Sequence, residues 1–175
     1  MFKIDEYVIH SRDGLCRITN VEPIDVMGDG EERDYFILVP VNNPKSRIYV
    51  PVNTADNLIR KPLSHEKALE IIDALPEIDE LQIENEKTRE QLYSAAMLKN
   101  DCVQLFKLIK TTYSRNMARR AKGHTATAVD ESYFKAASRA LYSELAFALD
   151  IDSKEIVDFI KDRIDGDVIP VPDNL

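Results

Sequence analysis

The sequence contains few of the residues that catalytic and cofactor sites commonly need. It has no tryptophan, five glycines and two cysteines among its 175 residues. Five glycines leave little material for a phosphate-binding loop, and neither an H-E-x-x-H nor a G-x-S-x-G motif is present. The three histidines, His10, His65 and His124, share no short metal-ligand spacing. These absences argue against an enzyme and predict no catalytic residue, metal, cofactor or small-molecule substrate.

Cysteine usage and hydropathy indicate a cytoplasmic protein. Cys16 and Cys102 lie in different segments without a C-x-x-C spacing, so we predict two reduced thiols rather than a disulfide or metal site. No apolar run approaches the roughly 20 residues that a membrane span needs. The N-terminus lacks the apolar core of a signal peptide. We therefore expect no membrane partner.

The net charge of −8 is unevenly distributed along the chain. Residues 101–148 carry eight Lys and Arg against four Asp and Glu, a local charge of +4, and the segments on either side are acidic. Binding to nucleic acid depends on a local basic surface rather than on the total charge. DNA therefore stays a candidate partner despite the negative net charge of the whole chain.

Residues 1–61 have the pattern of a small β domain. Short β-prone segments alternate with turn signals such as Asp13-Gly14 and Gly28-Asp29-Gly30. Strands are predicted near residues 6–10, 15–21, 35–39, 47–50 and 58–60. Five short strands in about 60 residues are typical of a closed barrel of the SH3 or Tudor type.

Residues 62–166 are predicted to form an all-α domain, which makes the fold class α+β, and residues 167–175 a flexible tail. Ser64, Asp101 and Asp130 are the expected N-caps of three helices. In the helix after Asp101, a core-facing apolar stripe recurs at helical spacing. It consists of Cys102, Phe106, Ile109, Tyr113 and Met117.

The segment from residue 79 to residue 98 is acidic and is predicted to form one or two surface helices. Glu84, Glu86 and Glu90 could suggest paired carboxylates for acid–base chemistry. No apolar or basic partners that would perturb them are evident in the sequence, so we interpret them as a solvated face.

Six cationic residues lie between Asp101 and Gly123, where Asp101 is the sole acidic residue. Helical spacing lets them form an outer face, and a further i,i+4 pair follows in the next helix. The resulting candidates for DNA binding are Lys107, Lys110, Arg115, Arg119, Arg120, Lys122, Lys135 and Arg139. Such an array binds phosphates independently of base sequence. A solvated face that serves only solubility fits the charge pattern equally well.

The strand near residues 47–50 is the second candidate surface. Pro51 limits this strand to an edge or an end of the sheet. Its exposed backbone, with Arg47 and Tyr49, can add to the sheet of a partner protein, and both residue types are favoured interface anchors. The alternative is that Tyr49 packs on the barrel and Arg47 is free.

Several segments together resemble the CarD family, also called the CarD/CdnL/transcription-repair coupling factor family. Phe2…Glu6-Tyr7-Val8-Ile9-His10…Gly14…Ile18 is similar to its first hairpin, and Tyr35-Phe36-Ile37-Leu38 and Val50-Pro51-Val52 are similar to its next two strands. Ala68…Ile71-Ile72…Leu75 resembles the helix after the barrel. Lys99-Asn100-Asp101 and the segment from Leu141 to Ala146 resemble landmarks of its helical domain. The likeness spans about residues 1–151 and depends on the order and spacing of these motifs.

The resemblance implies a Tudor-like domain that binds the RNA polymerase β subunit. It also implies a helical domain that contacts promoter DNA at the upstream edge of the melted bubble, without catalysis, and stabilises the open complex. Two polymerase-binding arginines of the family correspond to positions near Ile24 and Tyr49, and Arg47 is the expected substitute.

The sequence departs from this family in the segment that usually carries an exposed tryptophan. That segment corresponds to residues 86–89, where Arg89 joins the candidates for DNA binding. An apolar wedge holds distorted DNA in the family, so DNA contact here is expected to be weak and mediated by phosphates.

The leading hypothesis is a cytoplasmic, nucleoid-associated transcription regulator that holds RNA polymerase and promoter DNA together. The alternative is an adaptor that binds polymerase or another protein without contacting DNA. The acidic residues 77–90 and the missing tryptophan favour that alternative.

Overall fold

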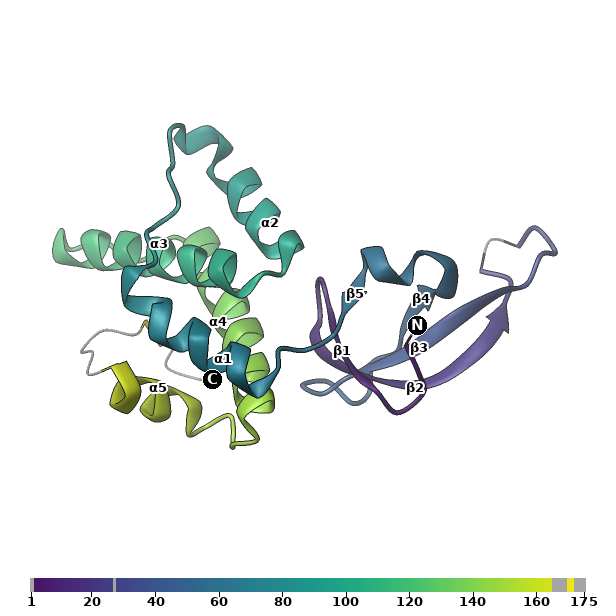
Figure 1. The fold of residues 1–175 in the computed structure, drawn as a ribbon. Coiled ribbons are helices and arrows are strands. Elements are labelled where there is room, and N and C mark those ends of the chain that lie inside the picture. The colour runs from purple at the N-terminus through teal and green to yellow at the C-terminus, as the bar shows by residue number, and fades with distance from the viewer. Residues whose placement is uncertain (1, 27, 165–169, 172–175) are drawn as a thin grey trace. The chain divides into compact units, whose positions relative to one another are not determined.

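The computed structural model describes residues 2–26, 28–164 and 170–171. The chain forms two compact units, Met1–Pro62 and Leu63–Leu175. Strands occupy the first unit and helices the second (Figure 1). The predicted order of strands first and helices second is therefore observed, and the fold class is α+β.

The N-terminal unit contains one antiparallel sheet in the order β4-β3-β2-β1-β5. Its strands are β1 (Tyr7–His10), β2 (Gly14–Ile24), β3 (Arg33–Pro40), β4 (Ile48–Pro51) and β5 (Ile59–Arg60). Gly14 has a φ of 70° in the tight turn between β1 and β2, where an L side chain would be strained. The apolar residues on one face of the strands form a separate small core, which includes Val8, Ile18, Leu38 and Val50.

The prediction of a closed barrel was wrong for the described residues, because no ladder joins the two edge strands β4 and β5. The chain passes from β4 through a 3-10 helix, η1 (Val52–Asn57), directly into β5. β5 has only two residues, and both pair with β1. Closure needs every strand to have two neighbours, and so short a strand supplies too little backbone for a second ladder.

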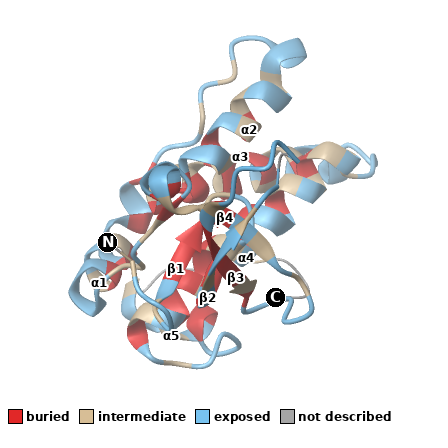
Figure 2. Cartoon of the chain, turned by 90° about the vertical axis from the view of Figure 1, so that its right-hand side faces the viewer, coloured by how far each residue is buried: buried red, intermediate tan, exposed pale blue. Residues whose placement is uncertain are grey.

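The C-terminal unit contains five helices within its described residues. They are α1 (His65–Ala74), α2 (Arg89–Lys99), α3 (Cys102–Ala121), α4 (Ala128–Leu149) and α5 (Ile156–Ile164). Two short 3-10 helices, η2 (Leu75–Glu77) and η3 (Glu86–Thr88), lie between α1 and α2. α3 packs extensively against α4, and one continuous apolar core runs through the unit. Figure 2 shows buried residues along both the strands and the helices.

Two of the three predicted N-caps are confirmed. The side chain of Ser64 accepts a hydrogen bond from the backbone of Lys67, and Asp101 accepts one from Gln104. The third prediction was wrong, because Thr127 caps α4 and Asp130 lies inside its first turn. The Thr127 hydroxyl accepts a hydrogen bond from the Asp130 backbone at 3.0 Å and donates one to the Asp130 carboxylate at 2.8 Å, so the acidic residue lies three positions after the cap.

The apolar stripe of α3 holds only for its first part. Cys102, Phe106 and Ile109 are buried, whereas Met117 is 45% exposed. The expected helices over residues 79–98 also begin late, since residues 79–85 are not helical. This segment runs beside α3, where the Leu81 backbone donates to the Thr111 hydroxyl at 2.8 Å.

Most of the predicted tail lies outside the described residues, as do 165 and 166 at the end of the expected last helix. The two described tail residues contact the helical core. The carbonyl oxygen of Pro170 accepts a hydrogen bond from the Tyr142 hydroxyl at 2.8 Å, and Val171 packs against the apolar cluster. Both cysteines are buried, and they form no disulfide with each other. Within the described ranges, no helix is long and apolar enough to cross a bilayer.

Candidate functional site

A buried carboxylate, Asp130, organises the polar centre of the helical unit. Its side chain has no exposed surface. The Thr127 hydroxyl donates to Asp130 Oδ2 at 2.8 Å, and the Tyr93 hydroxyl donates to Asp130 Oδ1 at 3.0 Å. Burial, together with the negative charge of Asp130, raises the pKa of Tyr93, so its hydroxyl stays protonated and can donate.

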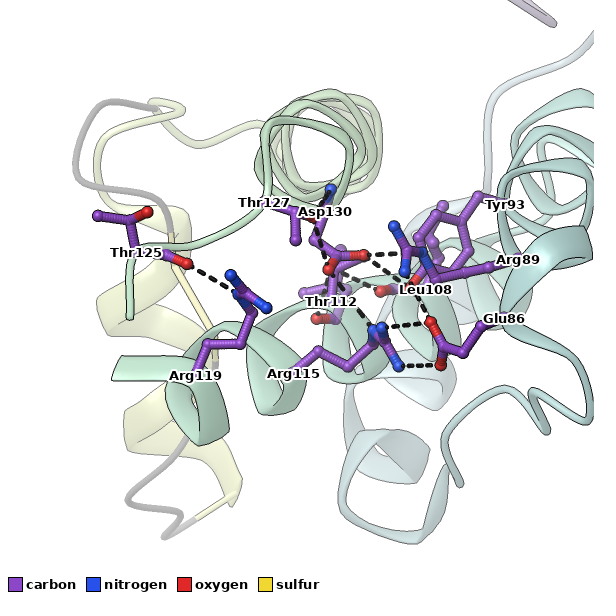
Figure 3. Close-up of polar contacts among 11 residues, drawn as sticks. Glu86, Arg89, Tyr93, Leu108, Thr112, Arg115, Arg119, Thr125, Thr127 and Asp130 are labelled. Carbon is purple, nitrogen blue, oxygen red and sulfur yellow. Dashed lines mark hydrogen bonds and ion pairs between the residues drawn. The ribbon is translucent and has the colours of Figure 1, made fainter. Parts of the chain in front are cut away.

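Two arginines from different helices converge on this carboxylate (Figure 3). Arg89, at the start of α2, places Nε 3.4 Å from Asp130 Oδ1. Arg115, in the last part of α3, places Nε 3.5 Å from Asp130 Oδ2. Both Nε atoms are buried and make no hydrogen bond, so their interaction with Asp130 is an ion pair. Asp130 thereby holds two positive charges close together.

Glu86 covers the outer side of these two guanidinium groups. Arg115 donates to both oxygens of Glu86, from Nη1 at 2.8 Å and Nη2 at 2.9 Å. Arg89 Nη1 donates a third hydrogen bond at 2.7 Å. The hydrogen bonds from Arg115, and then from Arg89, hold the pKa of Glu86 below its ordinary value. Four charged groups therefore form one network of two cations and two anions.

In the sequence, Asp101 is the sole acidic residue among the cations of α3, but other acidic residues oppose these cations in three dimensions. Tertiary contacts bring Glu86 and Asp130 against Arg115. The side chains of Arg89 and Arg115 are only 17% and 28% exposed, respectively. The outer face expected for Arg115 is thus occupied by acidic groups, and Glu86 is an ion-pair partner rather than a member of a solvated face.

Two further residues predicted to bind DNA, Lys107 and Lys110, are half-buried. Lys107 lies at the margin of the core, and Lys110 donates from Nζ to the carbonyl oxygen of Ile78. The Lys110 ammonium also lies 5.9 Å from the ring centre of Phe106. Lys110 therefore holds the segment after η2 against α3.

The remaining predicted cations are exposed near the end of α3 and along α4. They are Arg119, Arg120, Lys122, Lys135 and Arg139, which we call the exposed cation set. Arg119 Nε donates to the carbonyl oxygen of Thr125 at 2.8 Å, and Lys135 forms an ion pair with Glu131 at 3.0 Å. This set is the surface of the helical unit that best suits an anionic partner.

In the N-terminal unit, β4 is an edge strand whose outer side pairs with no other described strand. Tyr49 projects from this strand and is 52% exposed, although its neighbour Val50 is buried. Arg47 directly precedes β4, and its Nη1 donates to the carbonyl oxygens of Pro44 and Ser46, both at 3.0 Å. These contacts hold the Arg47 side chain against its own turn beside the edge.

Ile24 lies apart from this pair. It is opposite Arg33 in the sheet, whereas Tyr49 is opposite Ile37. Arg33 and Ile37 are four residues apart on β3, which corresponds to roughly 13 Å along the strand. Ile24 and Tyr49 therefore share a face of the sheet without being neighbours.

Sequence reasoning missed a second buried carboxylate, Glu144 of α4. Glu144 has no exposed surface, and its oxygens accept hydrogen bonds from the Leu63 backbone at 3.1 Å and from Cys102 Sγ at 3.5 Å. No local signal marked Glu144, because its partners are distant in sequence. Asp130 was detectable from the spacing of Thr127 and Asp130, although its two arginines were not. No set of His, Cys, Asp and Glu in the described part of the chain could hold a metal ion.

The family comparison concerns the β unit. Residues 2–63 match the family model described as the CarD-like/TRCF RID domain. The match ends one residue beyond the first compact unit and does not include the helices. No curated protein matches the chain.

Proposed function

Because residues 2–63 of this chain are a CarD-like/TRCF RID domain, we propose that it is a transcription regulator that binds two partners. This family is transcription-related and interacts with the RNA polymerase β subunit. The proposed partner of the β unit is that subunit, and the proposed partner of the helical unit is promoter DNA. The family match is the observation that carries the proposal.

The proposed polymerase contact is the free edge of β4. An edge strand presents unpaired backbone groups that can extend a partner's sheet, and an exposed tyrosine beside an arginine supplies side-chain anchors. Arg47 and Tyr49 are the central residues of this surface. Ile24 has a peripheral role, since it lies farther along the same face.

The proposed DNA contact uses the exposed cation set. Its five side chains carry positive charge and are exposed near the end of α3 and along α4. They suit phosphates and do not provide a base-specific contact, so the expected affinity is independent of sequence and falls steeply with salt. Binding the open promoter complex more tightly than the closed one would shift the population toward the open complex.

The polymerase contact is tested by binding of the full chain to purified RNA polymerase β subunit. We expect Arg47→Ala combined with Tyr49→Ala to weaken binding at least tenfold, the effect of losing one interface hot spot. A matched pair, Arg12→Ala with Leu58→Ala, changes exposed residues near the opposite side of the sheet and should bind normally. Equal binding by the two double variants would remove β4 from the interface.

One alternative function has specific support, namely an adaptor that binds polymerase without touching DNA. The sequence lacks tryptophan, and Arg89 and Arg115 are held by acidic groups of the same chain. A gel-shift titration with promoter DNA at several salt concentrations separates the two functions. Arg119→Glu, Arg120→Glu and Lys122→Glu together should abolish binding, whereas Lys99→Glu, Lys154→Glu and Lys161→Glu make the same charge change elsewhere. Absence of DNA binding by the native chain favours the adaptor, whereas equal binding by both triple variants would remove the exposed cation set from the DNA contact.

A further inference from the structure

The Glu86 carboxylate occupies the position that an external anion would take on a pair of arginines. It receives three hydrogen bonds from two guanidinium groups, two of them a parallel pair from Arg115. Its own side chain is 60% exposed, while the arginines beneath it are much less so. Glu86 can therefore leave without uncovering the apolar core.

We propose that Arg89 and Arg115 form a binding site for a phosphate-type oxyanion, and that Glu86 closes this site as an internal competitor. The DNA backbone as the source of the phosphate rests on the proposed function. Free phosphate is the other source, and the chemistry of recognition is the same for both.

Guanidinium geometry supports this exchange. An arginine can bind carboxylate or phosphate with two parallel N–H···O bonds, which a lysine cannot reproduce. The three donors that now meet on Glu86 can meet equally on the oxygens of one phosphate. Asp130 keeps these donors in place, because both Nε atoms lie against its buried oxygens. The site is thus preformed from beneath and does not need the ligand to assemble it.

The charge balance also matches a phosphate. With Glu86 in place, two arginines face two carboxylates, and without it they face Asp130 alone. Departure of Glu86 leaves one uncompensated positive charge, which a phosphodiester carrying one negative charge neutralises. Arg119 follows Arg115 by one helical turn and is exposed, so the site adjoins the exposed cation set.

The backbone around Glu86 has few constraints that oppose its departure. Glu86 lies in η3, which has only three residues, and the preceding residues 79–85 are not helical. Within η3, the Asn85 side chain accepts a hydrogen bond from the backbone of Lys87, and this contact does not depend on the Glu86 side chain. A change of rotamer at Glu86 is sufficient to open the site.

The first test measures inorganic phosphate binding to the full chain. The readout is the shift in Tm with phosphate concentration, followed by circular dichroism at a helical wavelength and at constant ionic strength. Glu86→Gln removes the competing charge. Glu84→Gln is the matched control, at an exposed position that forms no ion pair with another described residue. We expect Glu86→Gln to bind phosphate about tenfold more tightly than the native chain or the control, the effect of one charge-assisted hydrogen bond. Adding Arg115→Lys should cancel the gain while keeping the charge.

The second test measures binding to a duplex oligonucleotide. If the phosphate comes from DNA, Glu86→Gln should raise the affinity for the duplex. The slope of log K against log salt concentration should become more negative by about one, as one more phosphate contact predicts. A gain with inorganic phosphate alone assigns the site to free phosphate. No gain over Glu84→Gln in either test overturns the site. Phosphate binding by Glu86→Gln in a chain that fails to bind polymerase would refute the proposed function and leave the site standing.

Discussion

Replacing Asp130 by asparagine removes the buried negative charge that holds Arg89 and Arg115 together. Asparagine keeps the size of the side chain but offers one acceptor oxygen in place of two. The Tyr93 and Thr127 hydroxyls now donate to different oxygens of Asp130, so at least one of these hydrogen bonds is lost. The amide group that replaces the second oxygen also faces a donor.

The size of the effect follows from these contacts. Losing a hydrogen bond to a charged group costs about 1.5–3 kcal/mol, and removing one partner of a fully buried ion pair costs about 3–5 kcal/mol. The arginines keep Glu86 and part of their hydration, with 17% and 28% of their side chains exposed, so the full penalty does not apply. We expect Asp130→Asn to lower the free energy of unfolding of the helical unit by about 3 kcal/mol.

Urea unfolding at neutral pH, followed by circular dichroism at a helical wavelength, measures this change. Asp158→Asn removes an exposed charge from the first turn of α5 and is the matched control, with an expected change below about 0.5 kcal/mol. Tyr93→Phe combined with Asp130→Asn should cost less than the sum of the single changes, because the two residues share a hydrogen bond. A loss below about 1 kcal/mol for Asp130→Asn would show that the network is not stabilising.

Three further predictions concern pH, thiol reactivity and packing. Because the folded pKa of Glu86 is lowered by its arginines, its contribution to stability is present above its ordinary pKa of 4.5 and is lost as the pH falls below it. The Tm difference between the native chain and Glu86→Gln should shrink in acid, and a constant difference would contradict this. Burial, with a smaller effect of the Asp13 charge, raises the pKa of Cys16 to about 12, so alkylation at pH 8 should be roughly 1,000-fold slower than in the unfolded chain. Mass spectrometry of the labelled peptide checks this, and equal rates would refute it. Leu141→Ala, at a fully buried position, should lower stability by about 2–5 kcal/mol in urea unfolding, whereas Leu98→Ala, at a site 53% exposed, should lower it by less than half as much.

Features that depend on neighbours in the sequence were predictable. Asp13-Gly14 marked the first hairpin, and Ser64 and Asp101 marked two helix starts, because turns and caps are formed by hydrogen bonds within a few residues. The family resemblance of the N-terminal segment is likewise confirmed by the match over residues 2–63. The residues chosen for polymerase and DNA binding stay predictions.

Features that depend on distant contacts were predicted less well. Helical spacing placed Met117 on the face of Phe106, but a long helix extends past the core that covers its first turns, so Met117 is exposed. The prediction of a closed barrel was wrong for a related reason. Strand count and turn spacing do not determine whether the last strand is long enough to pair on both sides.

The strand and helix periods, two of the caps and the positive charge of residues 101–148 could be read from local sequence. Which of those charges are available to a partner depends on how the helices pack. Arg115 and Arg119 are one turn apart and look alike in the sequence, yet Arg115 is enclosed by Glu86 and Asp130 while Arg119 is exposed. The physical reason is that electrostatic energy depends on distance through space and on burial, and neither is set by separation along the chain.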